Sequence, residues 1–139
     1  MARAIPIIRL HGTLLVSIQV ALSDRLILEL KDDLAHEIRA YDAHGLVVEV
    51  SGVDLFDSFI AASIQALSNM ARLMGVRTIL AGLNAGMAIT LVEMGMHLDD
   101  VETALDLESA LDRLGERSDG ARAEAQLQDE ALLLGEEPR

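Results

Sequence analysis

A short apolar run that leads through a turn into a long apolar helix constrains this fold more than any other feature. Residues 46–50 (Leu-Val-Val-Glu-Val) are almost all apolar, as is typical of a strand covered on both faces. The turn at residues 53–61 follows, and apolar residues then recur at helical spacing to about Met74 or Gly75. A buried strand that passes directly into a helix predicts an α/β domain in which this turn is exposed.

The remaining periodicity predicts the order strand-strand-helix-strand-helix-strand-helix-strand-helix. The expected elements are residues 5–10, 13–18, 23–44, 46–50, 58–74, 77–81, 87–94, 101–104 and a helix from 106 onward. Ser23 or Asp24 can cap the first helix, Gly45 is expected to end it, and Asp106 can cap the last one. Residues 1–117 are therefore predicted to form a single α/β domain with one mixed sheet, its first two strands antiparallel and its helices mainly on one face.

The composition changes after residue 117. Residues 118–139 contain six acidic residues and two arginines, and they begin with Ser118-Asp119-Gly120. We expect this segment to be a flexible acidic tail outside the fold.

The charge and composition exclude several classes of function. The formal net charge is −12 and the only lysine is Lys31, so the phosphate neutralisation that nucleic acids and anionic membranes require is missing. Aromatic residues make up only 2%, which argues against sites that stack bases or sugars. Without cysteine the chain forms no disulfide and no thiolate metal site. No signal peptide or membrane-spanning run is visible, so a cytoplasmic protein is expected.

The sequence contains no recognisable catalytic or metal-binding motif. No Gly-x-Ser-x-Gly motif occurs, and the glycine-rich residues 82–86 lack the lysine of a phosphate-binding loop. The four histidines show no metal-ligand spacing: His11, His36, His44 and His97. We therefore predict a protein that is not an enzyme and binds no metal or cofactor.

Asp54 and Asp57 leave two chemical alternatives open, one of which is that they act as acid/base carboxylates. The other is that one of them accepts a phosphoryl group, as an aspartate does in receiver domains, but that chemistry needs an acidic pair after the first strand and a lysine late in the sheet. Neither is present, since the first strand ends with Leu10-His11-Gly12. The structural alternative is that both aspartates cap the helix or stabilise the turn.

Ser58 is the candidate for regulation by phosphorylation. It lies where the strand-to-helix turn meets the helix, and a helix N-terminus favours a phosphate. A phosphate adds about −1.5 to −2 charges, here beside Asp54 and Asp57. We expect it to change partner binding through Asp54, Asp57 and Phe59 without unfolding the domain. The structural alternative for Ser58 is again a helix cap.

Five stretches of the sequence match the pattern of a known family. Residues 14–19 (Leu-Leu-Val-Ser-Ile-Gln) and 53–61 (Val-Asp-Leu-Phe-Asp-Ser-Phe-Ile-Ala) carry the most specific match. The other three are residues 70–75, 88–95 and 102–108. Together they resemble the STAS domain of anti-sigma-factor antagonists, and most narrowly the RsbS-type scaffolds of the bacterial stressosome. The resemblance covers about residues 5–115.

This resemblance implies a non-enzymatic scaffold that joins RsbR-type STAS proteins in a large oligomer. It also implies that the scaffold sequesters an RsbT-type serine/threonine kinase and releases it once Ser58 is phosphorylated, and that an RsbX-type phosphatase removes the phosphate. Thr90 corresponds to a second phosphorylatable position in RsbR-type relatives. The alternatives are a simple antagonist that binds an anti-sigma kinase one to one, and a receiver-like domain.

Overall fold

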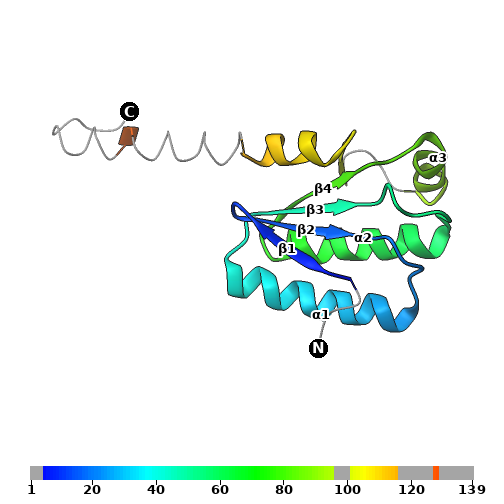
Figure 1. The fold of residues 1–139 in the computed structure, drawn as a ribbon, viewed down its shortest axis with the longest axis horizontal. Coiled ribbons are helices and arrows are strands. Elements are labelled where there is room, and N and C mark those ends of the chain that lie inside the picture. Colours follow the sequence, from blue (N-terminus) through cyan, green and yellow to red (C-terminus); the bar gives the residue numbers. More distant parts are fainter. Residues whose placement is uncertain (1–4, 96–100, 116–126, 129–139) are drawn as a thin grey trace.

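The computed structural model describes residues 5–95, 101–115 and 127–128, and Figure 1 shows the arrangement of their helices and strands. The strands are β1 (Ile7–Leu10), β2 (Thr13–Ser17), β3 (Gly45–Glu49), β4 (Arg77–Ala81) and β5 (Glu102–Ala104). The helices are α1 (Asp24–Tyr41), α2 (Ser58–Leu73) and α3 (Ala85–Glu93). Residues 107–115 form a further helix, the C-terminal helix.

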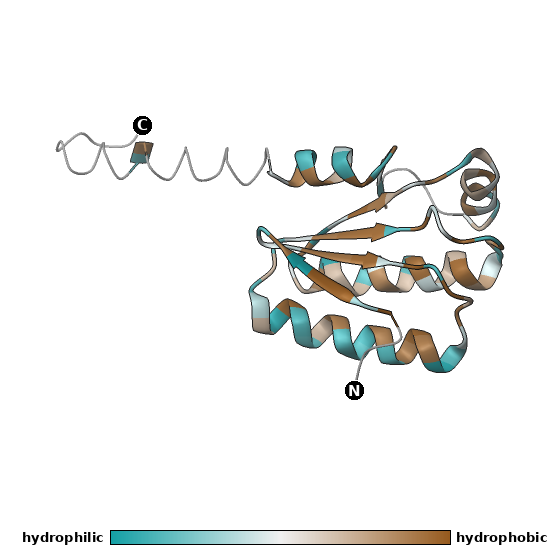
Figure 2. Ribbon diagram, viewed as in Figure 1, coloured by the Kyte–Doolittle hydropathy of each residue, from teal (hydrophilic) through white to brown (hydrophobic). Residues whose placement is uncertain are grey.

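The five strands form one mixed sheet in the order β1-β2-β3-β4-β5. β1 pairs with β2 in antiparallel orientation, and the other neighbours are parallel. The predicted α/β class, mixed sheet and opening hairpin are therefore confirmed. Figure 2 shows the central strands as hydrophobic along most of their length, which agrees with their burial on both faces.

Helices cover both faces of the sheet, although unequally. α1 and α2 pack on one face, where Leu34, Ile64 and Leu67 are fully buried against alternate residues of the strands. The C-terminal helix packs on the other face and places Ala110 and Leu114 against the remaining strand residues. The expectation of helices mainly on one face holds for the two long helices, and the last helix covers the opposite face.

The predicted end of the first helix is wrong. α1 ends at Tyr41, and Asp42 adopts a left-handed conformation with φ of 53° while its N–H donates to the carbonyl of Ile38. A short polar side chain tolerates this conformation, so no glycine is needed there. Gly45 instead begins β3. The N-terminal cap is Ser23, whose hydroxyl accepts a hydrogen bond from Leu26 N–H at 3.2 Å.

Polar contacts that the periodicity did not predict join the β1–β2 hairpin to α1. The Arg9 Nε donates to Glu37 Oε2 at 2.7 Å, and the Arg9 guanidinium lies 5.0 Å from the centre of the Tyr41 ring. The N–H of Gly12 donates to the Tyr41 hydroxyl at 3.1 Å. Glu37 is only 8% exposed, so its charge depends on Arg9 for compensation.

Two sequence expectations fall largely outside this description. The predicted acidic tail and His97 lie outside the described residues, apart from residues 127–128, which are helical.

Within the part of the chain that the structure describes, no helix is both long enough and apolar enough to cross a membrane.

Gly45 is predicted to be essential for packing of the C-terminal helix. A Cβ at this position would lie 2.9 Å from Leu114 Cδ1 and 3.3 Å from the hydroxyl of Thr13. Gly45→Ala should therefore lower the free energy of unfolding by about 1–3 kcal/mol, as overpacking of a core does. Urea denaturation would measure this change.

The control is Gly86→Ala in α3, where the new Cβ would meet only Asn84 Oδ1 at 3.4 Å. Alanine favours a helix over glycine by up to about 1 kcal/mol, so the control should be neutral or stabilising. Equal effects of the two substitutions would contradict the packing argument.

The cap of the C-terminal helix is predicted to make stability depend on pH. Ser109 N–H donates to Asp106 Oδ1 at 2.8 Å. This bond and one with the Ser109 side chain lower the pKa of Asp106 below its usual value of 3.8. Its contribution is then fully present above that value and is lost as the pH falls through the lower, folded-state pKa. In urea titrations between pH 2 and 6, any stability advantage of the wild type over Asp106→Asn should shrink at acid pH, whereas a constant difference would refute this role.

Candidate functional site

The turn between β3 and α2 presents a group of exposed side chains at one end of the domain. It begins with Val53 N–H donating to the Val50 carbonyl at 3.1 Å. Val53 and Phe56 are partly buried against the core, and they hold the turn in place. The residues between and after them are exposed: Asp54, Leu55, Asp57, Ser58 and Phe59.

Asp57 is the N-cap of α2. Its backbone is extended, and its Oδ1 accepts a hydrogen bond from Ile60 N–H at 3.0 Å. The structural role expected for Asp57 is therefore confirmed. The alternative role of Ser58 as the cap is wrong, because Asp57 already occupies that position and Ser58 is the first residue of the helix.

Ser58 is exposed, and its hydroxyl forms no hydrogen bond with the residues that the structure describes. It lies at the positive end of the α2 dipole, and the first turn of this helix carries no acidic residue. The first N–H groups of any helix lack partners within the helix. A phosphate on Ser58 would therefore meet a favourable local field without displacing a bond that the fold needs.

Thr90 has a different environment. It lies within α3, is partly buried, and its hydroxyl donates to the Gly86 carbonyl at 3.1 Å. Modification of Thr90 would have to break this bond. The start of α3 is fixed by Asn84, whose Oδ1 accepts a hydrogen bond from Met87 N–H at 2.9 Å.

A pocket of about 200 Å³ lies beside the β3–α2 turn, and we call it the Asp54 pocket. Its walls are the loop after β2 (Gln19, Val20, Ala21, Leu22), the turn (Val53, Asp54, Leu55, Asp57) and the start of α2 (Phe59, Ile60). It therefore brings together Asp54, Asp57 and Phe59, which the sequence singled out for partner binding. The loop after β2 was not predicted to take part.

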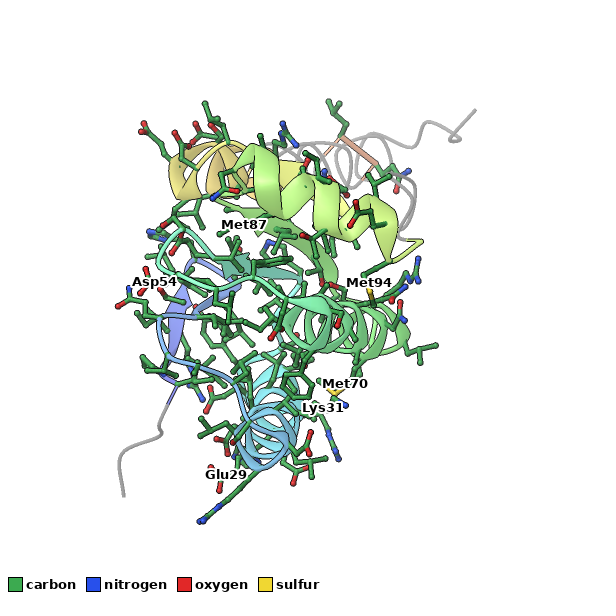
Figure 3. The ribbon with its side chains drawn as sticks, turned by 90° about the vertical axis from the view of Figure 1, so that its right-hand side faces the viewer. Glu29, Lys31, Asp54, Met70, Met87 and Met94 are labelled. Carbon is green, nitrogen blue, oxygen red and sulfur yellow. The ribbon has the colours of Figure 1, made fainter. Side chains whose placement is uncertain are left out.

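Figure 3 looks onto the carboxyl ends of the parallel strands β2, β3 and β4 and shows Asp54 at the surface, on the opposite side of this view from Met94. No hydrogen bond or ion pair joins Asp54 to any described residue, so its expected capping role is not observed. Lys31 lies away from Asp54 in the same view. The Asp54 carboxylate is thus an exposed negative charge at the edge of the pocket.

The described histidines do not come together as a metal site. Among residues 5–95, 101–115 and 127–128, no three histidine, aspartate or glutamate side chains are close enough to hold a metal ion.

Comparison with known proteins gives a match over most of the chain. The sequence pattern of the STAS domain matches residues 4–110. The chain is 31% identical over 70 residues to the "RsbT co-antagonist protein RsbRD" of Bacillus subtilis. This match spans 50% of the chain but only 25% of RsbRD.

Two solved structures resemble the whole domain. One is "Moorella thermoacetica RsbS S58E", with a TM-score of 0.74 and 32% identity, covering 83% of this chain and 97% of that one. The other belongs to "Molecular architecture of the stressosome, a signal integration and transduction hub", with a TM-score of 0.74 and 34% identity. The match covers 81% of this chain and 98% of the stressosome chain.

The geometry predicts separate roles for Asp57 and Asp54 in stability. Asp57→Ala removes the cap of α2 and should lower the free energy of unfolding by about 0.5–2 kcal/mol. Asp54→Ala removes no bond to the described residues and should change it by less than about 0.5 kcal/mol. Chemical denaturation of both variants would test this difference, and a larger loss in Asp54→Ala would show that the roles are assigned wrongly.

Proposed function

Because the chain belongs to the STAS domain family, we propose that it is a non-enzymatic, RsbS-like scaffold of a stressosome-type complex. In this proposal it sequesters an RsbT-type serine/threonine kinase and releases it when Ser58 is phosphorylated, so that a stress response is regulated. The observation that carries the proposal is the exposed Ser58 hydroxyl at the first position of α2, without a bond to the described residues.

Similarity to two solved structures supports the scaffold part of the proposal. The identities of 32% and 34% extend over nearly the full length of an RsbS chain and of a stressosome chain. The sequence match to RsbRD, a protein named as a co-antagonist of RsbT, points to the same system. We infer that the chain assembles with RsbR-type STAS proteins and that an RsbT-type kinase is its partner.

The chemistry of the switch is an ordinary phosphoryl transfer. The Ser58 oxygen forms a bond to the γ-phosphorus of ATP while the bond from that phosphorus to the bridging oxygen breaks, and ADP leaves. In this proposal the hydroxyl proton passes to a base of the kinase. An RsbX-type phosphatase would reverse the change by hydrolysis.

The phosphate changes the surface more than the fold. Asp57, not Ser58, caps α2, so the helix keeps its cap after modification. About −1.5 to −2 charges are added beside Asp54 and Asp57. The phosphate on Ser58 then lies close to the ADP that the kinase still holds. Repulsion between these two anionic groups favours release of the kinase.

Ser58 is predicted to be the principal phosphorylation site. Incubation with ATP and the RsbT-type kinase of the same organism should place one phosphate on Ser58, as mapped by mass spectrometry. Ser58→Ala should abolish it, and Thr90→Ala should leave it unchanged because the Thr90 hydroxyl is already bonded within α3.

The phosphorylated protein should keep the circular dichroism spectrum and unfolding midpoint of the unmodified one within error. Phosphate that persists in Ser58→Ala would move the switch elsewhere, with Thr90 as the next residue to examine. Absence of both binding and phosphorylation would refute the proposal. Light scattering of the chain mixed with an RsbR-type protein separates a scaffold, which forms a large particle, from a simple antagonist, which stays small.

A further inference from the structure

The Asp54 pocket combines apolar walls with an acidic edge beside the phosphorylation site. Leu55 is 72% exposed, Val20 is 46% exposed and Phe59 is 36% exposed, although all three are large apolar side chains. At about 200 Å³ the pocket is smaller than the sites of drug-sized ligands. Its size and walls suit one long side chain better than a metabolite.

The charges of the pocket select the kind of side chain. Two of the residues that line it are aspartates, and none is lysine or arginine. The described residues offer Asp54 no bond, and Asp57 uses one carboxylate oxygen for Ile60 N–H, so its second oxygen remains available. A lysine or arginine can lay its aliphatic stem on apolar walls while its charged end reaches a carboxylate.

We propose that the Asp54 pocket receives a single lysine or arginine side chain of the kinase that phosphorylates Ser58. This inference rests on the proposed function and adds the chemistry of the docking contact. The net charge of −12 gives the whole chain the same preference for a basic partner surface.

Docking and release then depend on different groups. The cation binds Asp54 and the apolar walls, and this contact sets the affinity for the kinase before phosphoryl transfer. The phosphate on Ser58 would attract this cation and not repel it, so release depends on the part of the kinase that holds ADP. The pocket therefore affects how tightly the unmodified protein binds, and the phosphate affects how long the product stays bound.

Asp54→Asn in the full-length protein tests the charge, and Leu55→Ala tests the apolar wall. Asp32→Asn is the matched control, because Asp32 is an exposed aspartate on α1 outside the pocket. With the RsbT-type kinase of the same organism, Asp54→Asn should raise the Kd on the order of tenfold, as loss of a charge-assisted hydrogen bond does. Leu55→Ala should raise the Kd several-fold, and Asp32→Asn should change it less than twofold.

Salt provides a second readout that simple loss of stability would not produce. The difference in Kd between the wild type and Asp54→Asn should narrow from 50 to 500 mM NaCl, because salt screens the exposed ion pair. Unfolding midpoints of all three variants should match that of the wild type, so that a change in Kd reports the contact itself.

The outcomes separate this inference from the function on which it rests. If the kinase binds and phosphorylates the wild type, and Asp54→Asn and Leu55→Ala bind it equally well, the pocket proposal is overturned and the function stands. If Asp54→Asn alters only the size of the self-assembled particle, the pocket contacts another copy and the proposal is also overturned. If the wild type itself neither binds the kinase nor is modified, both proposals fail.

Discussion

The parallel alignment of β2, β3 and β4 is the constraint on which the site depends. Ser17, Glu49 and Ala81 lie in register at the carboxyl ends of these strands, so the loops that follow leave the sheet at one edge. Alternate residues of these strands belong to two core clusters on opposite faces of the sheet. A slip of one residue in the pairing would move the side chains of each cluster to the other face, where they do not fit. The hydrophobic core therefore fixes the position of the β3–α2 turn relative to the loop after β2, and with it the shape of the Asp54 pocket.

Much of the fold could be predicted because its signals are local. Continuous apolar runs mark the central strands, and apolar residues at helical spacing mark α1 and α2. The predictions from sequence were wrong or incomplete where the role of a residue depends on a contact with a residue distant in the sequence. Gly45 was expected to end a helix, yet it begins β3 and lies beneath Leu114, and nothing in the neighbouring sequence signals that contact. In the same way, the pairing of Arg9 with Glu37 depends on the hairpin packing beside α1, which no local pattern specifies.

The candidate site was predictable to the extent that it belongs to one segment. Ser58, Asp54, Asp57 and Phe59 follow one another in a single turn, so their proximity was clear from the sequence. The contribution of the loop after β2 to the Asp54 pocket could not be predicted, because it depends on β2 lying parallel to β3. The structure also resolved an ambiguity that the sequence left open: Asp57 and Ser58 could both serve as a cap, and the hydrogen bond from Ile60 shows that Asp57 does. The fold thereby leaves the serine hydroxyl available for chemistry, while stability rests on its neighbour.

The direction of the C-terminal helix determines how the domain would be oriented when it is attached to a linker or a solid support. Leu114 packs against Gly45 at the amino end of β3, whereas Ser58 follows the carboxyl end of the same strand. In Figure 1 this helix runs toward the end of the sheet away from α3. Position 115 therefore lies at one pole of the domain and the serine at the other. A linker or solid support attached at position 115 would orient each molecule with its acidic pocket and serine facing outward, so that immobilisation itself would leave that pole accessible.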